Sequence, residues 1–129
     1  MVVDSSAVLA VMLDEPDQSI YLETMKRAKD LTMSAPTLFE CRLVALRKSG
    51  VELETKLLSF IRGLNVRITA FDEPQAARAA DAFRRYGKGR DRAALNFGDC
   101  FSYALAKTRG EPLLYKGGDF ARTDVAAAV

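Results

Sequence analysis

Residues Met1–Ala10 read MVVDSSAVLA and place two structural signals side by side. Val2–Val3 is a β-branched pair that is typical of a buried strand. Asp4–Ser6 follows directly, and such side chains accept hydrogen bonds from the free N–H groups at the start of a helix. This stretch therefore predicts a buried strand, then a short apolar helix over Ala7–Leu13, with an acidic side chain at the junction.

The rest of the chain continues this alternation of strands and helices. Apolar spacing, prolines and glycines predict helices over residues 17–29, 36–50, 52–64, 72–86 and 100–108, the first capped by Asp17. Extended segments are predicted at 31–35, 66–71 and 112–115, with residues 124–129 as a further edge strand. Alternating elements favour an α/β fold, a mainly parallel sheet covered by helices on both faces. With 129 residues and no linker-like stretch, residues 1–129 are expected to form a single domain.

The composition limits where the protein can reside and which catalytic groups it can use. The net charge is +2 and no apolar run reaches the roughly 20 residues of a membrane span, so we expect a cytoplasmic protein without a membrane partner. The N-terminus lacks the pattern of a signal peptide. The sequence has no histidine, which removes imidazole bases, Ser-His triads and most zinc sites. Hydrolytic chemistry would then depend on carboxylates, lysine, tyrosine or a metal-activated water.

Four acidic residues stand where such chemistry could be assembled. Asp4 and Asp119 follow predicted strands, whereas Glu40 and Asp99 lie near the starts of predicted helices. In parallel α/β sheets, sites form beyond the carboxyl ends of the strands, so all four could meet at one edge. Gathered carboxylates repel one another unless a cation compensates them, and Mg²⁺ or Mn²⁺ prefers such oxygen ligands.

Each acid also has a simpler interpretation, and the joint placement is what favours a metal site. Asp99 could only cap its helix, and Asp119 lies in a Gly-Gly turn where aspartate is common. Cys41 and Cys100 each follow a candidate ligand and are interpreted as reduced core thiols.

Other residues could support the acids. Ser6 could bond an acid or cap the helix, and Asn96 could orient Asp99 or form a turn. A basic segment surrounds Tyr86 and could bind phosphates and stack on a base, or could simply be a solvated charged face. Its cationic residues are Arg84, Arg85, Lys88, Arg90 and Arg92.

Three blocks together resemble the PIN domain, and specifically the VapC toxins of bacterial toxin–antitoxin pairs. They read MVVDSSAVLAVMLDEPD, SAPTLFECRLVAL and LNFGDCFSYALAKTRGEPLLYKGGDFARTD, and the likeness covers nearly the whole chain. The resemblance implies a three-layer α/β/α sandwich with a four- to five-stranded, mainly parallel sheet. It also implies Mg²⁺- or Mn²⁺-dependent endoribonuclease activity on translation-related RNA, homodimerisation, and inhibition by a cognate VapB-like antitoxin.

By this resemblance the metal-binding and catalytic acids are Asp4, Glu40, Asp99 and Asp119, supported by Ser6. One position departs from the pattern. Many relatives have an acid or asparagine where this chain has Gly118, so Asp124 could share or replace the fourth acid.

Two other functions stay open from the residues alone. A haloacid-dehalogenase-type phosphatase also opens with a strand ending in aspartate, but it needs a second aspartate where Ser6 stands. A non-catalytic PIN-like interaction module is the other alternative, although a pure scaffold does not require the four acids. Carboxylate–metal hydrolysis also leaves DNA open as a substrate, since the 2′-hydroxyl need not take part.

Overall fold

The computed structural model describes all 129 residues. Its centre is a sheet of four short parallel strands in the order β3-β2-β1-β4. These are β1 (Val2–Val3), β2 (Thr32–Ser34), β3 (Arg67–Thr69) and β4 (Leu113–Leu114). The predicted α/β class and parallel sheet are confirmed, with four strands. The predicted edge strand at 124–129 is reduced to one bridge, between Leu113 and Ala127.

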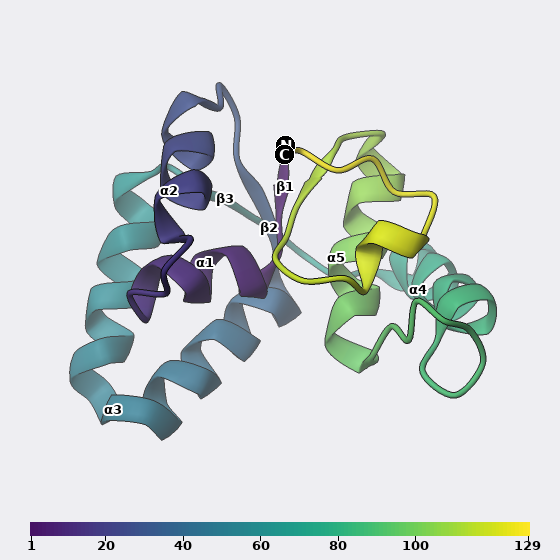
Figure 1. Cartoon of the computed structure of the whole chain (residues 1–129), viewed down its shortest axis with the longest axis horizontal. Coiled ribbons are helices and arrows are strands. Elements are labelled where there is room, and N and C mark those ends of the chain that lie inside the picture. Colours follow the sequence, from purple (N-terminus) through teal and green to yellow (C-terminus); the bar gives the residue numbers. More distant parts are fainter.

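Five helices and a short 3₁₀ helix connect and cover the strands. They are α1 (Ser5–Met12), α2 (Gln18–Arg27), α3 (Ala35–Gly63), α4 (Glu73–Tyr86), α5 (Phe97–Arg109) and η1 (Phe120–Arg122). Figure 1 shows α1, α2 and α3 on one side of the sheet and α4 and α5 on the other. None of these helices has the length and apolar character needed to cross a membrane.

Alternating strand residues build two cores, one on each face of the sheet. Val3 and Leu114 pack in the cluster below α1, α2 and α3. Their neighbours Val2 and Leu113 pack in the cluster below α4 and α5. Because side chains alternate across a strand, two-residue strands suffice to anchor both layers.

Two adjacent predicted helices are joined into α3 through a sharp bend (Figure 1). Ser49 and Gly50 leave the helical conformation there, with φ of −145° and 72°. Gly50 takes the left-handed φ at little steric cost because it lacks a Cβ. The predicted helix end at Gly50 is therefore confirmed: two helices meet at a kink within α3.

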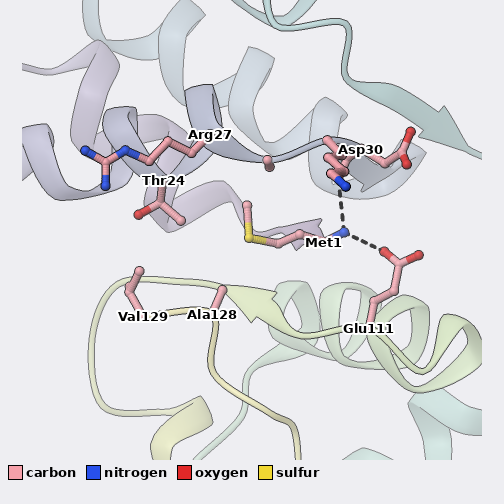
Figure 2. Close-up of a pocket in the computed structure, with 9 residues that line it drawn as sticks. Met1, Thr24, Arg27, Asp30, Glu111, Ala128 and Val129 are labelled. Atoms are coloured by element: carbon pink, nitrogen blue, oxygen red, sulfur yellow. Dashed lines mark hydrogen bonds and ion pairs between the residues drawn. The ribbon is translucent and has the colours of Figure 1, made fainter.

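The N-terminal ends of the strands lie beside the chain termini. The Met1 ammonium group donates to the Asp30 carbonyl at 3.0 Å and to the Glu111 carboxylate at 2.7 Å. Figure 2 shows these bonds beside an open hollow of about 520 Å³, which Ala128 and Val129 also line. The four candidate acids belong to the opposite end of the sheet.

Candidate active site

Asp4 lies at the carboxyl end of β1 and caps α1, and it is only 3% exposed. Its Oδ2 accepts hydrogen bonds from the Ser6 backbone N–H at 3.0 Å and from the Ser6 hydroxyl at 2.6 Å. Its Oδ1 accepts from the Ser102 hydroxyl at 2.5 Å. Three neutral donors orient this carboxylate and solvate it without supplying a positive charge.

Glu40 lies against the first residues of α1 and of α5. It lies in the second turn of α3, and its Oε1 accepts a hydrogen bond from the Ser5 hydroxyl at 2.5 Å. Its Oε2 occupies the space that a methyl group at Gly98 would need. The glycine thus allows α5 to begin directly against the Glu40 carboxylate.

Asp99 is the third residue of α5 and lies near the other acids. Its Oδ2 accepts from the Asn96 N–H at 2.9 Å, while the Asn96 side chain accepts from the Asp99 N–H at 2.9 Å, which is a capping box. Burial raises the pKa of the Asp99 carboxyl to about 7, and the Asn96 hydrogen bond opposes that shift. The negative charges of three nearby acids raise this pKa as well: Asp4, Asp119 and Glu40.

Asp119 completes the set from an exposed turn between β4 and η1. Its side chain makes no capping hydrogen bond, and Gly117 before it has a left-handed φ of 100°. Lys116, three residues before Asp119, holds the turn in place. The Lys116 N–H donates to Ser6 Oγ at 2.9 Å, and its ammonium group binds the carboxylates of Glu15 and Asp17.

The four acids share one property: no lysine or arginine is paired with any of them. Every ion pair in the molecule involves other carboxylates. Their side chains do not form a converged cluster of three or more ligands. Asp4, Glu40 and Asp99 each accept a hydrogen bond from a neighbouring donor. Oxygen donors with uncompensated negative charge are the set that a hard divalent cation prefers, so the residues present fit such an ion.

Comparison with known proteins shows the family of the chain. The PIN domain family matches residues 1–126. A ribonuclease VapC of Mycolicibacterium smegmatis is 45% identical over 127 residues, covering 98% of each chain. The chain belongs to the PIN-domain family. Its sequence likeness to that relative places it among the VapC proteins.

Solved structures agree with the PIN-domain fold. The crystal structure of Mycobacterium tuberculosis VapC20, described as a sarcin-ricin loop cleaving toxin, matches with a TM-score of 0.79 at 17% identity. It covers 97% of this chain and 95% of that one. A toxin–antitoxin complex from Klebsiella pneumoniae matches with a TM-score of 0.75 at 16% identity over 99% and 97% of the two chains. At these identities the likeness concerns the fold of the PIN domain.

Asp124 is engaged elsewhere in this PIN domain. Its carboxylate accepts hydrogen bonds from the Tyr103 hydroxyl at 2.5 Å and from Lys107 at 3.1 Å, and Arg85 lies 3.7 Å away. The Tyr103 hydrogen bond, assisted by Lys107, keeps the pKa of this carboxyl below its usual range. Asp124 therefore binds the C-terminal segment to α5. Of Asp119 and Asp124, only Asp119 is among the acids whose charges raise the pKa of Asp99.

The predicted basic segment separates into two parts. Arg84 and Arg85, at the end of α4, are paired with Asp81 at 3.2 and 3.7 Å. The loop that follows carries the exposed residues Lys88, Arg90 and Arg92, none of which forms an ion pair. This loop leads directly into Asn96 and α5, and thus into the site.

The two cysteines confirm their assignment as core thiols. Cys41 and Cys100 are buried and unpaired. Burial raises the pKa of the Cys41 thiol far above its usual range and that of Cys100 to about 11. Neither is a thiolate near neutral pH, so neither is a nucleophile.

Asp17 begins α2, as predicted, but its side chain makes no capping hydrogen bond. It binds Lys116 instead, at 2.6 Å, which an analysis of local signals misses because the two residues lie 99 positions apart.

Sequence reasoning also missed several residues that position the acids, namely Ser5, Thr37, Gly98, Ser102 and Lys116. One usable signal was present: Ser102 follows Asp99 by three residues in a mostly apolar helix, so it shares the face of that acid.

Proposed function

We propose that this protein is the toxin of a type II toxin–antitoxin pair, a cytoplasmic endoribonuclease that hydrolyses phosphodiester bonds in translation-related RNA such as tRNA or rRNA. Asp4, Glu40, Asp99 and Asp119 would hold Mg²⁺ or Mn²⁺. The observation that carries this proposal is electrostatic: Asp4, Glu40 and Asp119 lie near enough to Asp99 for their charges to raise its pKa. None of the four acids has a paired cation. The similarity to VapC ribonucleases supports the RNA substrate.

The bound cation would supply Lewis-acid chemistry, lowering the pKa of a water and neutralising charge on the phosphate. The protein's own residues perform the positioning. Hydrogen bonds from Ser6 and Ser102 fix Asp4, the Ser5 hydroxyl fixes Glu40, and the capping box fixes Asp99. Such orienting partners determine how well the ligands hold an ion.

Lys88, Arg90 and Arg92 are proposed to bind the RNA backbone. They extend from the loop that precedes α5, and none of them forms an ion pair. Contacts of this kind bind phosphates irrespective of base and weaken as salt is added. Arg84 and Arg85 contribute less in this proposal, because Asp81 already pairs with both.

Two protein partners complete the proposal. A cognate VapB-like antitoxin is supported by the structural likeness to a toxin–antitoxin complex. A homodimer is supported by an apolar hollow of about 720 Å³ between α4 and α5. Phe97, at its edge, is 81% exposed, and an apolar surface of this kind is typical of an interface.

The first test is cleavage of total cellular RNA by purified, antitoxin-free protein. Discrete fragments are expected with Mg²⁺ or Mn²⁺, none with EDTA, and none with the Asp4→Asn or Asp99→Asn variant. Asp119→Asn should abolish cleavage, whereas Asp124→Asn should retain it, because Asp124 is bound by Tyr103 and Lys107.

Other outcomes would favour the alternatives. Full activity of Asp99→Asn would contradict the assignment. Cleavage of DNA but not RNA would change the substrate, and turnover of a phosphomonoester alone would favour a phosphatase. Absence of both cleavage and Mn²⁺ binding would leave an interaction module.

A further inference from the structure

A chain of buried hydroxyls lies behind Asp4, on the side away from solvent. The Ser102 hydroxyl donates to Asp4 Oδ1 at 2.5 Å, and the Thr37 hydroxyl lies 3.3 Å from the Ser102 hydroxyl. Ser102 is 0% exposed and Thr37 is 2% exposed. Bulk solvent does not reach these groups, and the hydrogen bonds that they make are to other groups of the protein.

The hydrogen bonds from Thr37 to Ser102 and from Ser102 to Asp4 connect the three segments that carry Glu40, Asp99 and Asp4. Ser102 lies on α5 three residues after Asp99, and Thr37 lies on α3 three residues before Glu40. Residues three apart share a face of a helix, so each hydroxyl is one turn from an acid of the site. The Thr37–Ser102–Asp4 chain therefore fixes the relative placement of β1, α3 and α5.

The direction of these hydrogen bonds follows from the chemistry of the Asp4 carboxylate, to which Ser102 donates. An ionised carboxylate only accepts, so the single proton of Ser102 is committed to Asp4. Thr37 must then donate to Ser102, and both O–H dipoles point toward the Asp4 carboxylate. This arrangement stabilises a buried negative charge that has no cationic partner.

We propose that Ser102, assisted by Thr37, is a positioning residue for Asp4 and sets how well that carboxylate holds a divalent cation. The inference rests on the proposed metal-dependent nuclease function and deepens it. Ser102 occupies the inner oxygen of Asp4, which leaves the carboxylate oriented toward the other acids. Loss of an orienting partner of a ligand commonly costs 10–100-fold in metal affinity or activity.

The molecule contains a matched control for the loss of a buried hydroxyl. Ser34 is 1% exposed at the end of β2, and its hydroxyl has no hydrogen-bond partner. Ser34→Ala removes the same group from the same depth without disturbing Asp4. A comparison of Ser102→Ala with Ser34→Ala therefore separates positioning from a general effect of the core.

The experiment measures Mn²⁺ affinity by calorimetry and RNA cleavage kinetics on the full chain, with unfolding midpoints in EDTA to verify folding. Ser102→Ala is expected to weaken Mn²⁺ binding and lower kcat by about 10–100-fold, with KM for RNA changed little. Ser34→Ala should match the wild type in Mn²⁺ affinity and kcat, and its unfolding midpoint should be equal or higher, because the hydroxyl that it removes is buried without a partner. Thr37→Val, which keeps its shape, should cause a smaller loss than Ser102→Ala, and should add nothing in the double variant because Thr37 acts through Ser102.

Equal Mn²⁺ affinity and kcat for Ser102→Ala and Ser34→Ala would overturn the inference. Additive losses in the double variant would also overturn it. Should Ser102→Ala not fold, Thr37→Val decides: wild-type affinity and kcat in this variant would count against the chain. Failure of the wild type to bind Mn²⁺ and cleave RNA would instead count against the proposed function.

Discussion

At the scale of single residues, the ionised Asp99 carboxylate is expected to destabilise the folded protein when no metal is bound. Its carboxyl has a pKa of about 7 in the folded protein and about 3.9 in an unfolded chain. The folded state therefore binds the Asp99 proton more tightly than the unfolded state does. The stabilisation that this proton provides is lost as the pH rises through 7, and above that pH the ionised carboxylate lowers the free energy of unfolding. Asp99→Asn removes this penalty, so in EDTA at about pH 8 the variant should melt at a higher temperature than the wild type.

Below about pH 4 the two melting temperatures should converge, since aspartate is then protonated in both folded and unfolded states. Glu52→Gln, which changes a solvated acid whose side chain is 83% exposed, should show no such pH dependence. An equal or lower midpoint for Asp99→Asn at the higher pH would contradict the repulsion.

Gly98 gives a second prediction at this scale. A Cβ at this position would collide with Glu40 Oε2, at the end of a flexible side chain. Gly98→Ala should therefore displace the Glu40 carboxylate and lower the rate of RNA cleavage, with little loss of stability because alanine favours a helix by about 0.5–1 kcal/mol. Gly118→Ala is the matched control near Asp119: its Cβ would meet nothing within 4 Å. A fully active Gly98→Ala variant would show that the placement of Glu40 does not limit the reaction.

At the scale of elements, the bend of α3 depends on one glycine. Gly50 has a φ of 72°, and a Cβ there would touch nothing within 4 Å, so only the backbone opposes a substitution. Gly50→Ala should lower the free energy of unfolding by about 1–3 kcal/mol, because φ of 72° with ψ of −157° is a conformation that essentially only glycine adopts. Gly63→Ala, in the last turn of the same helix and equally open, should raise it by about 0.4–1 kcal/mol. Urea unfolding of the two variants measures both, and a shift of the same sign for both would refute this account of the bend.

At the scale of the whole molecule, the apolar hollow between α4 and α5 is expected to be covered by a second copy of the chain. Phe97 is 81% exposed, and its ring stacks edge-on against Phe101 with centroids 4.8 Å apart. Phe97→Glu should convert a dimer into a monomer in size-exclusion chromatography with light scattering, because a carboxylate is costly to bury. Ile20→Glu, at a 55% exposed position on α2, is the control and should stay dimeric. A monomeric wild type, or a Phe97→Glu variant that stays dimeric, would remove this face from consideration.

Much of the architecture follows from signals within a few residues of one another. The strand and cap in Val2–Ser6 and the break at Gly50 are local, and both appear at the predicted places. The helix predicted from residue 100 begins earlier, at Phe97, because Asn96 caps it. Helical and strand periodicity, caps and glycines act within one or two turns, so one chain suffices to identify them. The candidate acids were predicted for the same reason, since each stands at the boundary of such an element.

The partners of those acids depend on segments far apart in the chain, and only folding brings them together. Asp17 binds Lys116 rather than capping α2, Asp124 binds Tyr103, and Ser102 binds Asp4 from 98 residues away. Composition and periodicity say which residues face inward, but they do not say which polar groups meet there. That choice is made by the parallel order of the strands, which sets α1, α3 and α5 around one end of the sheet and thereby determines which hydroxyls orient the carboxylates.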